Sequence, residues 1–196
     1  MKLLGLTGGI GMGKSTAAEL LRQRGLPVVD TDLLAREVVE PGQPALQEIK
    51  TLFGAEVIDA GGRLRRDELA ARVFADDTQR RQLEAITHPR IRERWVAQAE
   101  AWRGAGQPMG VVVIPLLFET GTEACFDAIV CAACSNATQH RRLLARGWTP
   151  SQIEQRLHAQ WPIEKKMAAS TYVLWTEGTL DAHAQQLARI VAAEGK

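Results

Sequence analysis

Residues 4–16 read LGLTGGIGMGKST, an apolar strand-like run followed by a glycine-rich turn and the start of a helical pattern. Gly8, four further residues and then Gly13-Lys14-Ser15 fit the phosphate-binding loop pattern. Glycines adopt backbone angles that other residues avoid, and they let the main chain approach a ligand closely. The N–H groups of such a loop and the positive end of the following helix form an anion-binding concavity. The motif therefore favours nucleotide phosphate binding over the alternative, a strand-to-helix turn that binds nothing.

Two side chains of this motif carry the chemistry. Lys14 can reach the β- and γ-phosphates of a nucleotide, and Ser15 can ligate the Mg²⁺ that accompanies them. We therefore expect a nucleotide together with Mg²⁺ at this loop.

Composition and charge narrow the classes of protein to which the chain can belong. Its 196 residues suit one domain, or one core with insertions. The formal net charge is +1, from 24 basic and 23 acidic residues, which argues against a nucleic-acid binder with a basic stripe. No apolar run is long enough to span a bilayer, and the start of the chain lacks a signal-peptide pattern. We expect a cytoplasmic protein that acts as a monomer, an oligomer being the alternative, without nucleic-acid or membrane partners.

The three cysteines do not suggest a disulfide framework, because their number is odd. Cys131 and Cys134 form a Cys-x-x-Cys pair inside an apolar run, without a second such pair or a pair of histidines. We expect two small buried core residues here, and a redox or metal pair is the alternative.

The order of elements predicts an α/β fold. A strand at 2–7, a helix at 15–24 and a strand at 26–29 form a strand–helix–strand opening, which indicates a parallel, doubly wound sheet. Further strands are expected at 109–114, 126–133 and 172–175, which gives five parallel strands flanked by helices, closed by a helix at 180–193. Between residues 33 and 106 only helical patterns occur, and this stretch is too long for an ordinary crossover. Its helices are expected at 44–53, 66–74, 78–86 and 89–102, with His88-Pro89 as a junction between the last two.

Carboxylates follow two of the expected strands. Asp30 and Asp32 end the second strand, and Glu119 follows the third, so all three fall at the edge of the sheet where ligands bind. An aspartate here can cap the next helix, or it can act as a base that positions an acceptor hydroxyl. The residues alone leave both roles open, and one aspartate can cap the helix while the other acts as the base. For residues 116–118 core packing is favoured.

A basic helical hairpin separates the last two strands. Arg142 and Arg146 are four residues apart and share one helix face at 138–146. Helices at 151–160 and from residue 162 follow, the latter with Lys165 and Lys166. Such a hairpin resembles a mobile lid whose cations stabilise a transferring phosphoryl group, and a charged surface hairpin is the alternative.

Six groups of residues together resemble the bacterial dephospho-coenzyme A kinase family, a family of phosphate-loop kinases. They cover nearly the whole chain in the family's order. The phosphate loop alone is generic, whereas the Asp-x-Asp, His-Pro and Pro-Leu-Leu-x-Glu segments together are specific. The groups are residues 6–16, 29–42, 53–54 with 62–66, 86–91, 114–119, and Gln139, Arg142 and Arg146 with residues 156–160 and Pro162.

The resemblance implies transfer of the γ-phosphate of ATP to the ribose 3′-hydroxyl of dephospho-coenzyme A, with Mg²⁺. It implies a nucleotide-binding core at 1–32, 107–134 and 170–196, a helical coenzyme A-binding insertion at 33–106, and a lid at 135–169. Asp32, Lys14 and Arg142 become the catalytic candidates. The residues implied for ATP are Gly8, Gly9, Gly11, Met12, Gly13, Lys14, Ser15, Thr16, Arg142 and Arg146. Those implied for the acceptor are Asp32, Arg66, His88, Leu117 and Glu119.

The chain departs from the family's pattern at a few positions. Met12 stands where serine is common, and Gly147 follows Arg146 where an acidic residue is frequent. Residues 170–171 are Ser-Thr instead of Ala-Asp, and residues 175–176 are Trp-Thr instead of Asp-Asn. The last two differences concern the region expected to hold adenine.

Two other functions fit parts of the sequence. Another phosphate-loop kinase for a small metabolite or a nucleoside monophosphate would share the core, but the helical insertion and the His-Pro segment argue against it. A nucleotide-dependent switch without transfer activity would share the loop, but Asp32 and the arginines of the hairpin favour an enzyme.

Overall fold

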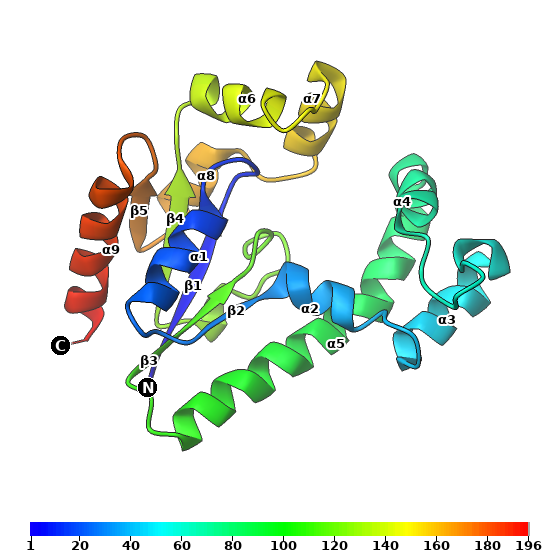
Figure 1. Cartoon of the computed structure of the whole chain (residues 1–196), viewed down its shortest axis with the longest axis horizontal. Helices are drawn as coiled ribbons and strands as arrows, with labels where there is room; N and C mark the ends of the chain where they lie inside the picture. The colour runs from blue at the N-terminus through cyan, green and yellow to red at the C-terminus, as the bar shows by residue number, and fades with distance from the viewer. Residues whose placement is uncertain (196) are drawn as a thin grey trace. The chain divides into compact units, whose positions relative to one another are not determined.

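The structure, a computed structural model, describes residues 1–195. They form two compact units: residues 1–30 with the chain from residue 99 onward, and residues 31–98. The first unit contains a five-stranded parallel sheet (Figure 1), as expected. In spatial order its strands are β2 (Val28–Asp30), β3 (Met109–Val113), β1 (Lys2–Gly8), β4 (Ala128–Ala133) and β5 (Tyr172–Trp175). Because β1 lies in the middle, the loop that follows it opens at the centre of the carboxyl edge.

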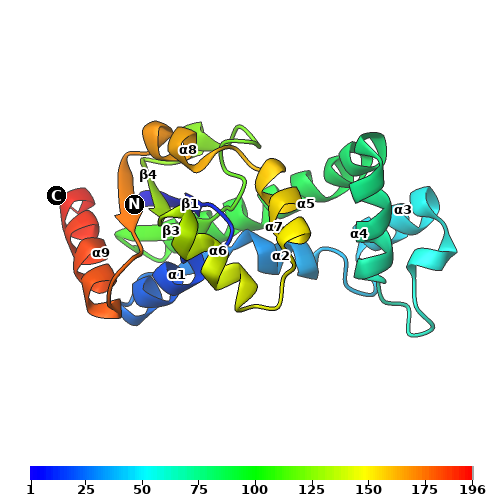
Figure 2. The same ribbon diagram turned by 90° about the horizontal axis from the view of Figure 1, so that it is seen from above.

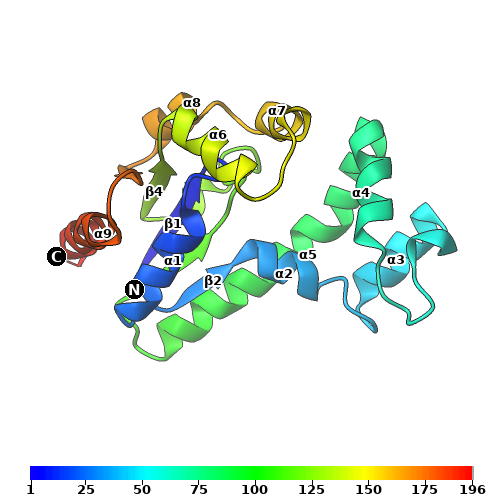
Figure 3. The ribbon, with the colours of Figure 1, turned by 45° about the horizontal axis from the view of Figure 1, so that its top comes forward.

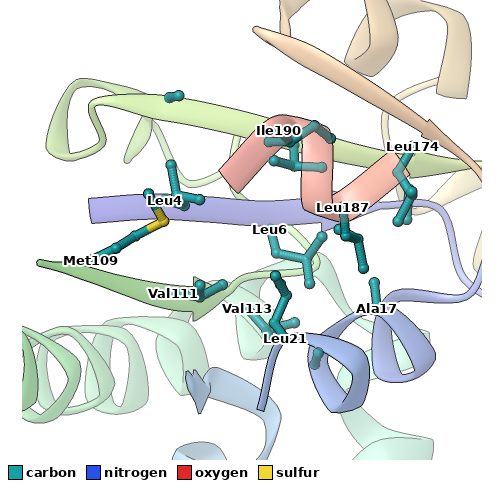
Figure 4. Packing of buried hydrophobic residues seen from close by; sticks show 14 residues of the cluster. Leu4, Leu6, Ala17, Leu21, Met109, Val111, Val113, Leu174, Leu187 and Ile190 are labelled. Atoms are coloured by element: carbon teal, nitrogen blue, oxygen red, sulfur yellow. The ribbon is translucent and has the colours of Figure 1, made fainter. Parts of the chain in front are cut away.

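One face of the sheet packs against α1 (Lys14–Gln23) and α9 (Leu180–Glu194). Alternate residues of a strand point to the same face, so Leu4 and Leu6 of β1 lie beside Val111 and Val113 of β3. Figure 4 shows these side chains meeting the apolar sides of the two helices. The helix residues in this cluster are Ala17, Ala18, Leu21, Leu187 and Ile190.

The opposite face is covered by α8 (Ile163–Ala169), by the end of α5 and by the segment after β3, which includes a short 3₁₀ turn at Glu123–Cys125. Figure 2 shows α1 and α8 on opposite sides of the sheet. Two strand glycines make room for large side chains on this face. A Cβ on Gly5 would lie 2.7 Å from Leu117, and one on Gly110 would lie 2.4 Å from the ring of Trp102.

Two helices lie beyond the carboxyl ends of β1 and β4 (Figure 3), namely α6 (Asn136–Leu144) and α7 (Pro150–His158). Ser135 caps α6 by accepting a hydrogen bond from the Thr138 N–H. Thr149 and Gln152 form a reciprocal capping box at the start of α7. Between the two helices Gly147 has a φ of 83°, a left-handed conformation that suits glycine.

The second unit is helical and has a core of its own. It contains α2 (Thr31–Glu37), α3 (Pro44–Phe53), a 3₁₀ turn (Ala55–Val57), α4 (Arg66–Ala75) and most of α5 (Asp77–Gly104). Its buried cluster includes Val38, Val39, Ala45, Ile49, Phe53, Val57 and Leu69. The turn at residues 59–63 closes through Asp59, whose carboxylate accepts from the Gly61 and Arg63 N–H groups.

The expected junction at His88-Pro89 is wrong, because α5 continues through it as one helix of 28 residues. Proline removes one backbone donor and crowds the preceding turn. The carbonyl that Pro89 leaves without a donor is that of Ala85, four residues earlier, and Ala85 is exposed, so water can take the place of the missing N–H. The helix therefore continues through the proline at the cost of one backbone hydrogen bond.

Most other expected elements lie within one or two residues of their observed bounds. The helix expected at 44–53 and the strand expected at 172–175 match α3 and β5. Among residues 1–195, no helix has the length and the apolar character that crossing a membrane would require.

We predict that Gly110→Ala destabilises the first unit by about 1–3 kcal/mol, because the added methyl group collides with the Trp102 ring. Urea unfolding measures the difference in free energy. Gly104→Ala is the matched control, since within the described chain its Cβ would meet no atom within 4 Å. Trp102→Leu in the Gly110→Ala background should restore part of the loss. Equal stability of Gly110→Ala and Gly104→Ala would contradict the packing described here.

Candidate active site

The phosphate loop connects β1 to α1 at the carboxyl edge of the sheet. Gly8, Gly11 and Gly13 have φ angles of 141°, 74° and 90°, which side chains make unfavourable. Gly8 is also restricted by space, because a Cβ there would lie 2.2 Å from Ala132 O. The glycines of the sequence pattern are therefore required by the backbone conformation of the loop and, at Gly8, by the lack of space for a Cβ.

Lys14, the first residue of α1, folds back over the loop. Its Nζ lies 2.9 Å from both Gly8 O and Gly9 O, and it donates to each carbonyl oxygen. This places a positive charge beside the loop that is expected to receive phosphates. Ser15 follows with an exposed side chain, and Thr16 is half-buried.

The loop is also held from elements far away in the sequence. Gln139 of α6 donates to Ile10 O at 2.7 Å, and Gln160 accepts from the Ile10 N–H at 3.2 Å. Thr176, directly after β5, donates from its hydroxyl to Met12 O at 3.0 Å. We did not identify these three side chains as site residues from the sequence, although Gln139 and Gln160 belong to the family pattern.

Arg142 of α6 contacts the same corner of the loop. Its guanidinium donates to Thr176 O at 2.6 Å, to Thr176 Oγ1 at 3.0 Å and to Gly11 O at 3.5 Å. Arg142 thus lies next to the phosphate loop, as its expected contact with ATP requires. Arg146 is exposed just beyond the end of α6.

Met12, where serine is common in the family, has only 1% of its surface exposed. It packs in a small cluster with Ala133 and Cys134, bordered by Ile163 and Met167. The side chain therefore supports the loop from the protein interior, and a contact with ATP at this position would use its backbone.

A buried ion pair lies after β3. The Lys166 side chain is 0% exposed, and its Nζ lies 2.8 Å from Glu119 Oε1 and 2.9 Å from Pro115 O. Glu119 Oε1 also accepts from the Trp161 N–H, and Glu119 Oε2 is buried without a hydrogen-bond partner. The sequence left Lys166 either as a cation of a lid or as part of a charged surface hairpin. Its burial fits neither, and the side chain instead joins α8 to the segment after β3.

The other residues of that segment are mainly structural in their contacts. Leu117 is fully buried against Gly5, and its carbonyl oxygen accepts from the Thr122 hydroxyl. The ring of Phe118 stacks on that of Trp161, with centroids 5.7 Å apart. Because its side chain is buried, Leu117 can contribute to a binding surface only through the course of its backbone.

Three candidate residues belong to the second unit. Asp32 is exposed in the first turn of α2, where an acidic side chain stabilises the helix dipole. Arg66 begins α4, and it donates to Arg36 O and lies 3.9 Å from Glu40. His88 is exposed in the middle of α5.

Cys131 and Cys134 are buried in the core, as expected, and both are free thiols. Burial raises the pKa of the Cys131 thiol to about 11, against a weaker opposite effect from Lys166 and Lys14. Burial also raises the pKa of Cys134. Because the thiolate is the reactive form, these cysteines are poorly suited to redox chemistry.

Glu177 follows Thr176 in the segment after β5. Its Oε1 accepts from the Ser135 hydroxyl and from the Ser135 N–H, which ties the end of β4 to the end of β5. Hydrogen bonds from the side chains of Ser135 and Thr138 and from the Ser135 N–H lower the pKa of Glu177 from 4.5 to about 2. The carboxylate is therefore part of the fold in its charged form.

Comparison with known proteins agrees with this architecture. The family model described as Dephospho-CoA kinase matches residues 2–182. The dephospho-CoA kinase of Anaeromyxobacter dehalogenans is 46% identical over 193 residues, covering 98% of this chain and 92% of that protein. The chain belongs to the dephospho-CoA kinase family. The Geobacillus kaustophilus member is 39% identical over 189 residues, covering 96% and 94%.

A solved structure shares the same fold. The crystal structure of a Thermus thermophilus protein has a TM-score of 0.87 and 36% identity, and the match covers 98% of this chain and 97% of that one. Membership of the dephospho-CoA kinase family makes the chain an ATP-dependent phosphotransferase. It also favours this family over the other phosphate-loop kinases considered from the sequence.

We predict that Glu177→Gln removes a pH-dependent part of the stability. The folded pKa of about 2 lies below the ordinary 4.5, so the charged carboxylate stabilises the fold above about pH 4.5. This contribution is lost as the pH falls toward 2. The difference in urea midpoint between the wild type and Glu177→Gln should therefore shrink from pH 6 to pH 3.

Ser135→Ala, which removes one of the donors, should reduce the pH dependence in part. A difference between the wild type and Glu177→Gln that stays constant down to pH 3 would contradict the lowered pKa.

Proposed function

We propose that the chain transfers the γ-phosphate of ATP to the ribose 3′-hydroxyl of dephospho-coenzyme A, giving coenzyme A and ADP. The observation that carries the proposal is the family match over residues 2–182. The phosphate loop agrees with it, because its glycines have the left-handed backbone of an anion-binding loop and Lys14 lies over it.

In this proposal the loop and Lys14 hold the ATP phosphates. Phosphoryl transfer needs mainly positioning and stabilisation of charge, which backbone N–H groups and an ammonium provide. The exposed Ser15 hydroxyl at the start of α1 is a hard oxygen ligand of the kind that Mg²⁺ accepts, so the residues present fit this ion. When bound, Mg²⁺ would neutralise negative charge on the β- and γ-phosphates.

Asp32 is proposed as the base that positions the 3′-hydroxyl and accepts its proton. Asp30 ends β2, two strands from β1 in the sheet, which corresponds to about 10 Å. Asp32 follows after two Cα steps of about 3.8 Å each, so the covalent chain keeps it near the carboxyl edge. This short covalent link to the end of β2 is the observation that supports the role of Asp32 as the base.

The remaining assignments concern the acceptor and the nucleotide. We propose that residues 33–106 bind the coenzyme A part of the acceptor, with Arg66 and His88, and that Leu117 and Glu119 shape its site. Residues 135–169 are proposed as the lid, from which Arg142 and Arg146 contact ATP. Arg142 lies beside Gly11, which suits a cation that stabilises the transferring phosphoryl group.

One reaction tests the function. Protein, Mg-ATP and dephospho-coenzyme A should yield coenzyme A and ADP, detected by mass. Lys14→Ala should lose most activity and phosphate affinity, because the ammonium is removed from the loop. Lys2→Ala is the control, since Lys2 begins β1 and lies about 20 Å from the loop along the strand.

Phosphorylation of a different acceptor in a panel of nucleoside monophosphates and small alcohols would favour another kinase. ATP binding without any transfer would favour a switch. Unchanged kinetics of Lys14→Ala would overturn the assignment of the loop.

We predict that Asp32→Asn lowers kcat by about 10²–10⁴-fold and leaves the affinity for ATP nearly unchanged, because the base is lost and the loop is intact. Steady-state kinetics and nucleotide titration measure the two effects. Asp30→Asn is the matched variant, because both aspartates were candidates for the base. Near-full turnover of Asp32→Asn, or a larger loss in Asp30→Asn, would show that Asp32 is not the base.

A further inference from the structure

Thr176 makes contacts that its place after an edge strand does not suggest. Only 1% of its surface is exposed, although Trp175 before it and Gly178 beyond it are exposed. Its hydroxyl donates to Met12 O at 3.0 Å and accepts from Arg142 Nη1 at 3.0 Å. Its backbone oxygen accepts from Arg142 Nη2 at 2.6 Å. The hydroxyl and the carbonyl oxygen of this residue thus join the phosphate loop to α6, while its N–H donates to Ala133 O of β4 at 2.8 Å.

The contact with Met12 fixes the orientation of one loop peptide. Because a peptide group is planar and trans, holding the Met12 carbonyl toward Thr176 turns the Gly13 N–H to the opposite side. That N–H belongs to the residue directly before Lys14, at the start of α1. The hydroxyl of Thr176 therefore determines where an N–H group of the anion-binding loop points.

Packing acts on the same peptide. Gly13 has a φ of 90°, and a Cβ on it would lie 3.2 Å from Cβ, Cγ2 and Oγ1 of Thr176. The Thr176 side chain thus lies directly against the Gly13 backbone. A glycine in an open loop has many accessible conformations, and this neighbour limits them.

We propose that Thr176 is a positioning residue that keeps Met12 and Gly13 in their nucleotide-binding conformation and holds Arg142 beside the loop. The inference rests on the proposed nucleotide site and adds to it a residue that the sequence identified only as a departure in the adenine region. It assigns to Thr176 an effect on the phosphates through the loop backbone. When a loop is only partly in its binding-competent form, the apparent affinity falls by that fraction.

Two substitutions separate the hydroxyl from the packing. Thr176→Val keeps the shape and removes the hydroxyl, which leaves Met12 O and Arg142 Nη1 without this partner. Thr176→Ser keeps the hydroxyl and removes the methyl group. We expect Thr176→Val to raise the Kd for MgADP, measured by calorimetry, by about five- to 100-fold, and the KM for ATP by a similar factor. Thr176→Ser should recover most of this loss, and the KM for dephospho-coenzyme A should change little in either variant.

Thr179→Val is the control for stability alone. Thr179 lies in the same loop and caps α9 through the Ala182 N–H. Its loss should lower the Tm without changing the Kd for MgADP. A merely structural role of Thr176 would give the same pattern, whereas a positioning role changes nucleotide affinity in the folded protein.

Several results would overturn the inference: a Thr176→Val variant that binds MgADP like the wild type, a loss of Tm alone, or an equal loss of affinity in Thr176→Val and Thr176→Ser. The last result would show that the methyl group matters as much as the hydroxyl, so that the affinity depends on the complete side chain and not on the hydroxyl in particular. A wild-type protein that binds MgADP but makes no coenzyme A would refute the proposed function, while the contrast between Thr176→Val and Thr176→Ser in binding would still decide the role of Thr176.

Discussion

The phosphate loop has to present N–H groups on one side, and its glycine-rich backbone cannot hold that shape alone. Glycine loses more conformational freedom on folding than any other residue, so each left-handed position in the loop needs support. The chain supplies it by occupying the carbonyl oxygens: Lys14 contacts Gly8 and Gly9, Gln139 contacts Ile10, and Thr176 contacts Met12. These donors come from α1, from α6 and from the segment after β5. The rest of the first unit can be understood as the frame that brings them together.

Much of this frame could be predicted from the sequence, since it depends on local patterns. Apolar runs of strand length and glycines at helix ends gave all five strands and most helices within one or two residues. The helix break expected at Pro89 is wrong, because the carbonyl that proline leaves without a donor belongs to the exposed Ala85, where water can replace the missing N–H. The fourth strand begins at Ala128 instead of 126, because the chain first passes through a 3₁₀ turn that ends at Cys125. Neither the exposure of one residue in a helix nor the course of a turn can be seen in the periodicity of the residues.

The sequence predicted the residues of the phosphate-loop motif, but it did not predict the side chains that hold the loop in place. Residues with a motif, such as Lys14 and the loop glycines, were identified because their chemistry requires a fixed spacing along the chain. The residues that hold the loop were not, because Gln139, Gln160 and Thr176 are isolated polar residues that meet the loop only after folding. Lys166 was misread for the same reason: a lysine next to Lys165 indicates a charged surface, and only the fold shows that one of the two is buried.

The Lys166–Glu119 pair also bears on how residues 135–169 could close over a ligand. A buried ion pair is weak support for stability, because desolvation offsets much of the attraction, but it fixes the geometry of what it joins. Here it fixes α8, and Gln160 and Trp161 add contacts to the loop and to Glu119 just before it. At the other end of the segment, Ser135 binds Glu177 and Gln139 binds the loop. In the lid that we propose, both ends are held in this way, so any movement falls to its middle, around Gly147, whose left-handed backbone separates α6 from α7. Arg146 and α7 belong to this middle part, whereas the contacts that shape the phosphate loop, from Gln139 and Gln160, lie to either side of it.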